Sequence, residues 1–372
     1  MILHLLTDEK FTDYAIAQFS APEMMSEFVL VPSNNAMEMV KLIDQCTIVR
    51  QNSLEFNELL NRLGEYTGII FHGMFWGGWQ TPILQKVPKN VKVAWVFWGG
   101  EIYSRSDQYD VFLAPITKLL NDVHKRYKKI KEDTSSEIPF LLFKRIDYCL
   151  TDEKEEFEYI CKYTGIKFEY LWYNYYSLEK TLGTLIDKRC QGKNLWIGNS
   201  ASEKNNHLDV LWTIFKQGLH RKYNDRDIII PLSYGAPWMG DIVTKLSRFV
   251  FGKRVRILTS YMPLEEYNAM MLSCSTIILG YTQPAAQGNI ITALWLGMRV
   301  YLSEENMTYH YFKRIGCKIY SIERDLKHNN PNVYAPMIDE DVAHNRGILY
   351  TIYSQRHTMA GVKTIVDTLL KY

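Results

Sequence analysis

The chain has 372 residues, a formal net charge of +2, 47% hydrophobic residues and 23% charged residues. This length exceeds the core of one average domain, so two domains are expected. The composition is that of an ordinary soluble globular protein, and the small net charge argues against a dedicated nucleic-acid-binding protein, which would be far more basic. No apolar run reaches the roughly 20 residues that a membrane-spanning helix needs.

The first half of the chain alternates short apolar runs with helical patterns. Strands are predicted at residues 2–6, 28–31, 68–71, 93–97 and 148–150, and helices at residues 56–63 and 109–130. Strands that alternate with helices indicate a parallel sheet. The apolar start of the chain runs directly into polar residues at position 7, so no signal peptide is expected.

Two glycine-rich loops follow strands of this half, and each carries one ionisable residue. His72 lies in the segment 71–79 and Glu101 in the segment 97–103, and both are candidate catalytic residues. A carboxylate at the end of a strand could act as a general base on a hydroxyl group. The alternatives are that Glu101 complements a helix dipole and that His72 is a hydrogen-bonded structural histidine. A lone histidine and a lone glutamate on different strands do not specify a metal site.

Residues 118–131 have the pattern of a basic amphipathic helix. Its apolar positions, at spacings of three and four residues, are Leu119, Val123, Tyr127 and Ile130. Its basic positions are Lys118, Lys125, Arg126, Lys128, Lys129 and Lys131. Such a helix can lie on an anionic membrane surface, where the expected contacts are Lys125, Arg126, Lys128 and Lys129. A solvated outer helix fits the pattern equally well.

The second half starts a new series of elements. Strands are predicted at residues 194–198, 227–231, 255–258, 276–279, 299–302 and 318–321, and helices at residues 207–217, 241–251, 264–273 and 290–296. Two such series predict an α/β chain with two Rossmann-like domains, whose parallel sheets face each other across a cleft. The expected domains are residues 1–185 and 186–353, followed by a C-terminal helix at residues 354–372.

Polar loops follow three of these later strands. Their candidate ligand-binding residues are Gly198, Asn199, Ser200, Asn205, Tyr234, Gly235, Gln287, Gly288 and Asn289. The carboxyl ends of parallel strands share one edge of a sheet, so these residues are expected to line one site. Small residues let a ligand approach the backbone, and a helix start suits a diphosphate. An ordinary capped loop is the alternative for the segment 283–289.

The sequence indicates no cofactor and no metal. Its six cysteines form neither a CxxC pair nor a zinc-binding spacing. Cys149 and Cys274 lie in or beside apolar strand patterns, and such buried thiols fit a reducing cytoplasm. The chain also lacks the GxGxxG fingerprint and the GxxxxGK[ST] phosphate loop, which disfavours NAD and ATP.

Five short motifs, in this order along the chain, resemble those of glycosyltransferase family 56. They are WGGEIY at 98–103, IGNS at 197–200, PLSYG at 231–235, LEEYNAM at 264–270 and QGN at 287–289. The resemblance extends from about His72 to Asn306. It implies a GT-B fold, with the nucleotide-sugar donor in the C-terminal domain and the acceptor in the N-terminal domain. It also implies a metal-independent hexosyltransferase.

The resemblance further implies a substrate class and a location. The transferred group would be a deoxy sugar such as 4-acetamido-4,6-dideoxygalactose or fucose, from a dTDP- or GDP-linked donor. The acceptor would be a glycan on polyprenyl diphosphate, used for bacterial surface polysaccharide. The enzyme would be cytoplasmic and peripheral on the inner face of the inner membrane, with no nucleic-acid partner. Glu101 stands where the family has Asp, and the loop 283–287 also differs, which leaves the donor open.

Within this family, two carboxylates would have separate roles. Glu101 would deprotonate the acceptor hydroxyl if the reaction inverts, and would orient the acceptor if it retains. Glu266 would bind a donor hydroxyl, and its alternative is a solvated helix charge. A different function, a non-catalytic two-lobed module that binds a nucleotide or a sugar, also fits two Rossmann-like lobes. A nucleotide-sugar epimerase would need a catalytic acid–base array that these residues do not provide.

Overall fold

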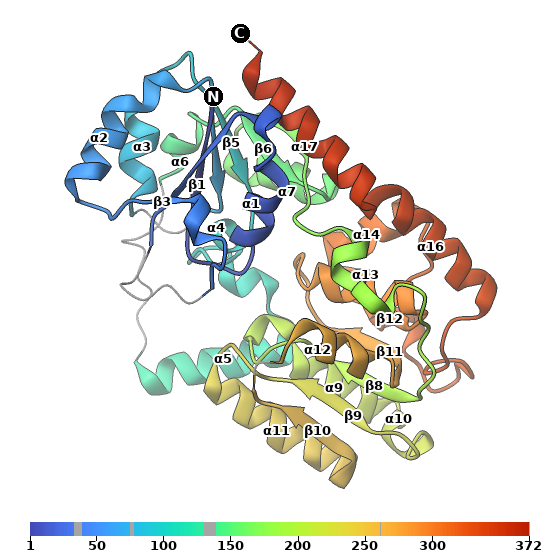
Figure 1. Ribbon diagram of the computed structural model, residues 1–372. Coiled ribbons are helices and arrows are strands. Elements are labelled where there is room, and N and C mark those ends of the chain that lie inside the picture. Colours follow the sequence, from blue (N-terminus) through green and yellow to red (C-terminus); the bar gives the residue numbers. More distant parts are fainter. Residues whose placement is uncertain (33–38, 75–77, 130–138, 261, 372) are drawn as a thin grey trace. The chain divides into compact units, whose positions relative to one another are not determined.

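The computed structural model describes residues 1–32, 39–74, 78–129, 139–260 and 262–371. The chain forms two compact units, and each contains one parallel sheet with helices around it (Figure 1). The first unit contains Met1–Arg105, Asp133–Ser177 and Gln355–Tyr372, and the second contains Ser106–Glu132 and Leu178–Ser354.

Two segments belong to a different unit than their place in the sequence suggests. Ser106–Glu132 lies inside the range 1–185 that was expected for the first domain, yet it belongs to the second unit. The helix at the end of the chain, α17 (Gln355–Leu370), belongs to the first unit and packs Val362, Ile365 and Leu369 into that core. Each unit is therefore assembled from segments that lie far apart in the sequence.

The first unit contains a seven-stranded sheet in the order β3-β2-β1-β4-β5-β6-β7. Every residue of β1 and β4 is buried, as expected for the central strands of a parallel sheet. The strands are β1 (Ile2–Leu6), β2 (Ser26–Leu30), β3 (Thr47–Ile48), β4 (Gly68–His72), β5 (Lys92–Val96), β6 (Tyr148–Thr151) and β7 (Glu169–Trp172). Besides α17, its helices are α1 (Thr12–Phe19), α2 (Leu54–Arg62), α3 (Gln80–Lys86), α4 (Gly100–Tyr103), α6 (Phe140–Phe143) and α7 (Lys154–Thr164).

The second unit contains a six-stranded sheet in the order β10-β9-β8-β11-β12-β13. The strands are β8 (Asn194–Ile197), β9 (Ile228–Pro231), β10 (Val255–Leu258), β11 (Cys274–Leu279), β12 (Arg299–Leu302) and β13 (Tyr320–Ser321). Helices before β11 are α5 (Pro115–Lys128), α8 (Leu178–Leu182), α9 (His207–Lys216), α10 (Leu219–Lys222), α11 (Pro237–Phe251) and α12 (Leu264–Met271). Later helices are α13 (Gln287–Leu296), α14 (Met307–Arg314), α15 (Ile322–Asp325) and α16 (Asp339–Tyr353).

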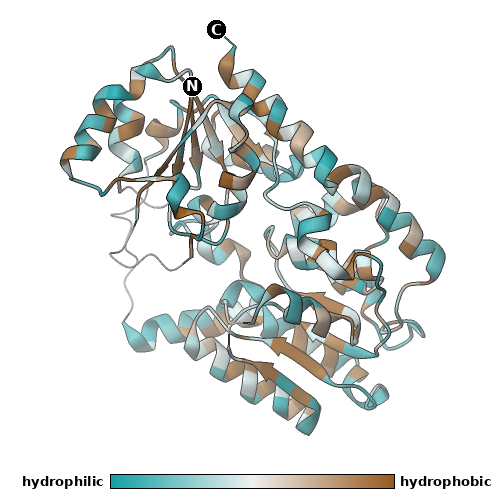
Figure 2. Cartoon of the chain, in the orientation of Figure 1, coloured by the Kyte–Doolittle hydropathy of each residue, from teal (hydrophilic) through white to brown (hydrophobic). Residues whose placement is uncertain are grey.

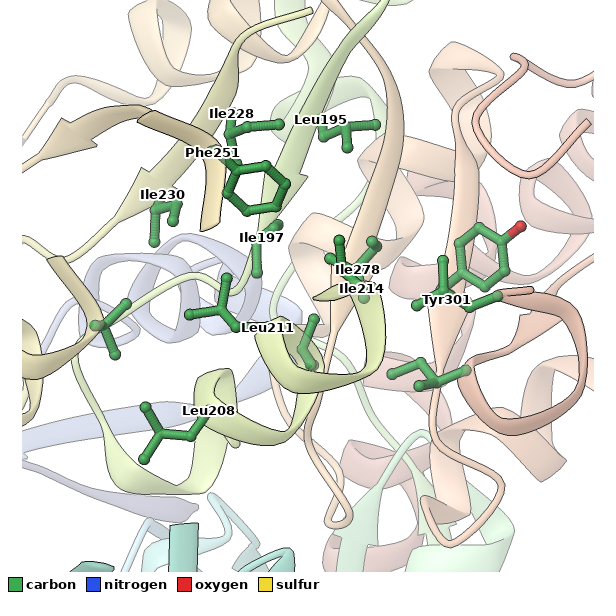
Figure 3. Packing of buried hydrophobic residues seen from close by; sticks show 14 of the residues in the cluster. Leu195, Ile197, Leu208, Leu211, Ile214, Ile228, Ile230, Phe251, Ile278 and Tyr301 are labelled. Atoms are coloured by element: carbon green, nitrogen blue, oxygen red, sulfur yellow. The ribbon is translucent and has the colours of Figure 1, made fainter. Parts of the chain in front are cut away.

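The core of the second unit lies between its sheet and the helices α9 and α11. Leu211 and Ile214 on α9 belong to one buried cluster with Ile197 of β8 and Ile278 of β11 (Figure 3). Figure 2 shows the central strands of this sheet in the hydrophobic colour. Continuous apolar strands are expected where both faces of a parallel sheet are covered.

The strands predicted from the sequence are all present, with ends that differ by at most two residues. The parallel sheets of both units confirm the predicted α/β class. The sequence patterns missed β3 and β7. Both strands lie at an edge of the first sheet, where β3 is exposed and β7 is half-buried or exposed, so burial on two faces does not require apolar residues throughout.

The single helix predicted at residues 109–130 is two elements. A 3₁₀ turn at Tyr109–Phe112 is followed by extended backbone, and α5 begins at Pro115. Proline has no N–H to donate and restricts the residue before it to extended conformations, so it starts a new helix here. Helix α5 ends at Lys128, while Ile130 and Lys131 of the predicted pattern lie outside the described residues.

Two other sequence predictions concern burial and membrane spans. Cys149 and Cys274 are buried and free, as expected. Burial raises the pKa of the Cys274 thiol to about 12, which keeps it protonated at neutral pH. Within the described ranges, no helix has the length and apolar character needed to cross a bilayer.

We expect Leu211→Ala to destabilise the second unit by about 2–5 kcal/mol, because it removes a buried side chain and leaves a cavity. The next residue, Trp212, is 52% exposed on the same helix, so Trp212→Ala is a matched control with a much smaller effect. Urea unfolding of the two variants measures the difference. Equal losses of stability would show that α9 does not pack as described.

Candidate functional site

The loop after β8 begins at a position that requires glycine. Gly198 has a φ of +69°, and a Cβ atom there would lie 2.1 Å from Nε2 of His207. The Asn205 side chain accepts a hydrogen bond from the N–H of Asn199 (3.1 Å) and donates one to Oγ of Ser200 (2.7 Å). Ser200 and Asn205 are each 1% exposed, so these two predicted ligand-binding residues hold the shape of the loop.

Hydrogen bonds join the loops that follow β8, β9 and β11. The Asn199 amide donates to the hydroxyl oxygen of Tyr234 (3.3 Å), and the Tyr281 hydroxyl donates to Oδ1 of Asn199 (2.5 Å). The N–H of Ala201 donates to the C=O of Tyr234 (2.6 Å), next to a bridge between Ala201 and Gly235. Tyr234 is 55% exposed, so its ring can contact a ligand. The three loops therefore meet at one edge of the sheet.

The start of α13 is open toward this edge. No side chain caps the helix, which begins at Gln287, and a Cβ atom at Gly288 would meet nothing within 4 Å. Asn289 donates from Nδ2 to the hydroxyl oxygen of Tyr267 on α12 (2.9 Å). A helix start with a positive dipole end beside open space suits an anionic group.

Two aromatic residues connect α13 to the loop after β8. The Tyr267 ring packs edge-on against the Trp196 ring, with centroids 4.8 Å apart. Trp196 in turn donates from Nε1 to the C=O of Gly198 (2.9 Å). Trp196 and Tyr267 look like ordinary strand and helix positions in the sequence, and Tyr281 like an ordinary loop aromatic, so none was predicted to belong to the site. Glu266, the neighbour of Tyr267, is exposed in the first turn of α12.

Lys204 is a further residue of this loop, with no signal in the sequence that predicts a role in the site. Its side chain lies in the loop after β8, is 5% exposed, and places Nζ 4.7 Å from the centroid of the Tyr109 ring. Burial lowers the pKa of this amine to about 7, although Glu203 acts in the opposite direction. A partly desolvated amine at a loop of this kind interacts strongly with an incoming anion, because water screens the pair poorly.

Glu101, in the first unit, is buried at the ends of β4 and β5. Its carboxylate accepts hydrogen bonds from the N–H of Met74 (2.9 Å), Nε1 of Trp95 (3.2 Å) and the N–H of Trp98 (3.2 Å). Burial raises the pKa of this carboxyl group to about 7, while the hydrogen bonds lower it. Glu101 therefore ties Met74, which follows β4, to Trp98, which follows β5, and the Glu101 residue is 3% exposed.

His72 lies in a buried chain of hydrogen bonds behind this loop. Trp98 donates from Nε1 to the Tyr175 hydroxyl (2.9 Å), which lies 2.9 Å from Nδ1 of His72. Nε2 of His72 lies 3.1 Å from Nδ1 of His4, and Nε2 of His4 lies 3.1 Å from Oγ of Ser26. Each contact has one donor and one acceptor if the Tyr175 hydroxyl donates to Nδ1 of His72, Nε2–H of His72 donates to His4, and Nε2–H of His4 donates to Ser26.

His4 and His72 are both neutral at neutral pH. Burial lowers the pKa of His72 to about 3 and that of His4 well below its usual value, and His72 further lowers the latter. Since both ring nitrogens of His72 are engaged and the side chain is 1% exposed, its position suits the support of Tyr175 and Trp98. Trp98 and Ser26, at the two ends of this series of hydrogen bonds, are both half-buried.

Comparison with known proteins identifies the fold. No protein-family model and no curated protein matches the sequence. A glycosyltransferase from Rickettsia africae is similar with a TM-score of 0.63 and 11% identity, over 100% of this chain and 98% of that chain. Sucrose-phosphate synthase from Thermosynechococcus elongatus is similar with a TM-score of 0.62 and 10% identity, over 99% of this chain and 98% of that chain.

A third similar structure holds ligands. Anabaena HepE, in complex with UDP and glucose, has a TM-score of 0.61 and 10% identity, over 100% of this chain and 99% of that chain. At such identities a likeness shows the fold alone. The chain has two Rossmann-like units with parallel sheets, and its fold is GT-B, as expected from the sequence. Membership of family 56 stays a prediction.

We expect the buried histidine pair to make the first unit less stable at low pH. Below the usual histidine pKa of about 6.5, the unfolded chain binds protons that the folded pair does not. Each neutral histidine then removes about 1.4 kcal/mol of stability per pH unit, for His72 until its folded pKa of about 3. In urea unfolding, the stability difference between wild type and His72→Gln should shrink at this rate. A stability difference between these two proteins that does not change with pH would contradict a neutral, buried His72.

Proposed function

We propose that this protein is a glycosyltransferase that moves a sugar from a nucleoside-diphosphate sugar to a glycan acceptor. The observation that carries the proposal is the meeting of three polar loops with the uncapped start of α13 at one edge of the second sheet. In a doubly wound α/β unit, this edge is where ligands bind. The GT-B fold supports the same interpretation, because the similar structures include glycosyltransferases.

The donor would bind to the second unit. Its diphosphate would rest against the start of α13 at Gly288, where the helix dipole favours negative charge. Lys204 would add a cation, and a bound diphosphate would favour the protonated form of an amine whose pKa is about 7. Preorganised dipoles and this cation would stabilise the departing nucleoside diphosphate as the glycosidic bond breaks. Glu266, exposed beside Tyr267, would contact a hydroxyl group of the sugar.

The acceptor would bind to the first unit, near Trp98 and Glu101. A pKa of about 7 suits a general base at neutral pH, and Glu101 is the carboxyl group that accepts from the N–H groups of Met74 after β4 and Trp98 after β5. In an inverting reaction Glu101 would take the proton of the acceptor hydroxyl. In a retaining reaction it would orient the acceptor loop through Trp98. His72 would act as a positioning residue through Tyr175.

The finer proposal follows the resemblance to family 56. The transferred sugar would be a deoxy sugar such as 4-acetamido-4,6-dideoxygalactose or fucose, and the donor a dTDP- or GDP-linked sugar. The acceptor would be a polyprenyl-diphosphate-linked glycan at the inner face of a bacterial inner membrane. Lys125, Arg126, Lys128 and Lys129 of the α5 segment would contact that surface. Lys125 also pairs with Asp110 (3.0 Å), so the other three residues would contribute more.

A non-catalytic module that binds a nucleotide or a sugar is the second candidate function. The full hydrogen bonding and burial of Glu101 favour it, because a structural carboxylate needs no contact with substrate. The two functions differ in one measurement. A transferase releases free nucleoside diphosphate when donor and acceptor are both present, whereas a binding module releases none.

We expect Gly288→Val to weaken nucleotide binding at least about tenfold without loss of fold, because the new side chain would fill the open space beside α13. Asn289→Ala should also weaken binding, since it frees the hydroxyl group of Tyr267. Isothermal calorimetry with dTDP, GDP and UDP measures the affinity. Gly347→Val is the matched control, because Gly347 also lies in a helix with nothing within 4 Å of its Cβ position. Unchanged affinity in both site variants would exclude this donor site.

We expect Glu101→Gln to lower kcat by roughly 100-fold or more while nucleotide affinity stays unchanged, the usual scale for loss of a general base. Because only the deprotonated carboxylate accepts a proton, kcat of the wild type should rise with pH through about 7. Glu156→Gln is the control. Glu156 is also buried with a pKa of about 7, but it bonds to Tyr103 and Thr151. Similar losses in both variants would indicate a structural role for Glu101.

A further inference from the structure

Helix α5 is amphipathic, but its apolar side faces outward. Ile116, Leu119, Val123 and Tyr127 recur at spacings of three and four residues, which places them on one side of the helix. They are 37%, 67%, 53% and 81% exposed. The buried residues of the helix are instead polar, Thr117 and Asn121. We call the four exposed residues the α5 stripe.

Specific contacts within the second unit hold α5 in this orientation. The Asp209 carboxylate on α9 accepts hydrogen bonds from the N–H of Ile116 (2.9 Å), the N–H of Thr117 (3.0 Å) and the Thr117 hydroxyl (2.7 Å). The His124 ring stacks on Trp238 of α11, with centroids 3.9 Å apart and an interplanar angle of 5°. These contacts hold α5 in place with the α5 stripe exposed, so the stripe is accessible to a binding partner.

The charges beside the α5 stripe indicate which partner fits. Lys118, Arg126, Lys128 and Lys129 are exposed around the stripe, and Figure 2 shows the C-terminal end of α5 in the hydrophilic colour. Asp122, which is half-buried, is the acidic residue of the helix. Apolar side chains flanked by basic ones match the headgroup region of an anionic bilayer. A second copy of this chain fits less well, because a symmetric contact would bring like charges together.

We propose that α5 docks the protein on an anionic lipid bilayer by inserting the α5 stripe into the headgroup region. The basic residues would attract the helix to the surface, and the stripe would hold it there. The inference rests on the proposed function for its choice of a lipid partner, since a lipid-linked acceptor lies at such a surface. It adds to the proposed function that exposed apolar side chains, and not the basic residues alone, attach the protein to the bilayer.

The test is co-sedimentation of the full chain with vesicles of phosphatidylcholine mixed with phosphatidylglycerol. We expect Leu119→Gln/Val123→Gln to lower the partition coefficient at least about tenfold at low and at high salt, since apolar burial is not screened. Arg126→Gln/Lys128→Gln/Lys129→Gln should lose binding mainly at low salt, because about 0.5 M salt already screens the charges in the wild type. Vesicles of phosphatidylcholine alone should bind the wild type weakly.

The matched control is Leu246→Gln/Phe249→Gln on α11, where the two side chains are 40% and 76% exposed in the same unit. This variant should bind vesicles as the wild type does. Wild-type binding by the α5 stripe variant, or an equal loss in the control, would overturn the proposal. So would a wild-type dimer, without lipid, that the stripe variant converts to a monomer. The assay contains neither donor nor acceptor, so its result does not depend on transferase activity.

Discussion

The side chain of Asn206 joins three separate segments of the second unit. Its Nδ2 donates to the C=O of Gly280 after β11 (2.9 Å) and to the C=O of Phe112 (3.2 Å), and its Oδ1 accepts from the N–H of Ala114 (2.8 Å). Asn206 is 1% exposed and has a φ of +48°, a conformation that asparagine tolerates better than most residues. The loop after β8, the loop after β11 and the start of the α5 segment are therefore fixed together.

The strands were predictable because parallel strands buried on both faces must be apolar along their length. The edge strands of the sheets and the assignment of segments to units were not predictable, because they depend on contacts between residues far apart in the sequence. Asn206 illustrates this limit, since its partners Phe112 and Gly280 are 94 and 74 residues away. Within the candidate site, glycines and polar loops were recognisable, whereas Lys204 and Tyr267 resemble ordinary surface and helix residues until burial and ring contacts are known.

The two ionisable residues proposed for the first unit differ in what burial does to them. Burial favours the neutral form of any group, so it raises the pKa of Glu101 toward neutrality and lowers that of His72 away from it. A carboxyl group near its pKa at neutral pH can exchange a proton, and a histidine with a pKa of about 3 cannot do so readily. The same physical effect therefore separates a candidate base from a positioning residue.

The contacts of Asn206 also connect the two proposals made for the second unit. Helix α5 begins at Pro115, directly after Ala114, whose N–H bonds to Asn206 in the loop after β8. Asp209, on the helix that follows this loop, accepts from the first turn of α5. A bilayer contact through the α5 stripe would thus set the height of the donor loops above the membrane, because these hydrogen bonds fix the start of α5 to the loop after β8 and to α9. Donor binding and membrane docking would then depend on the same set of hydrogen bonds.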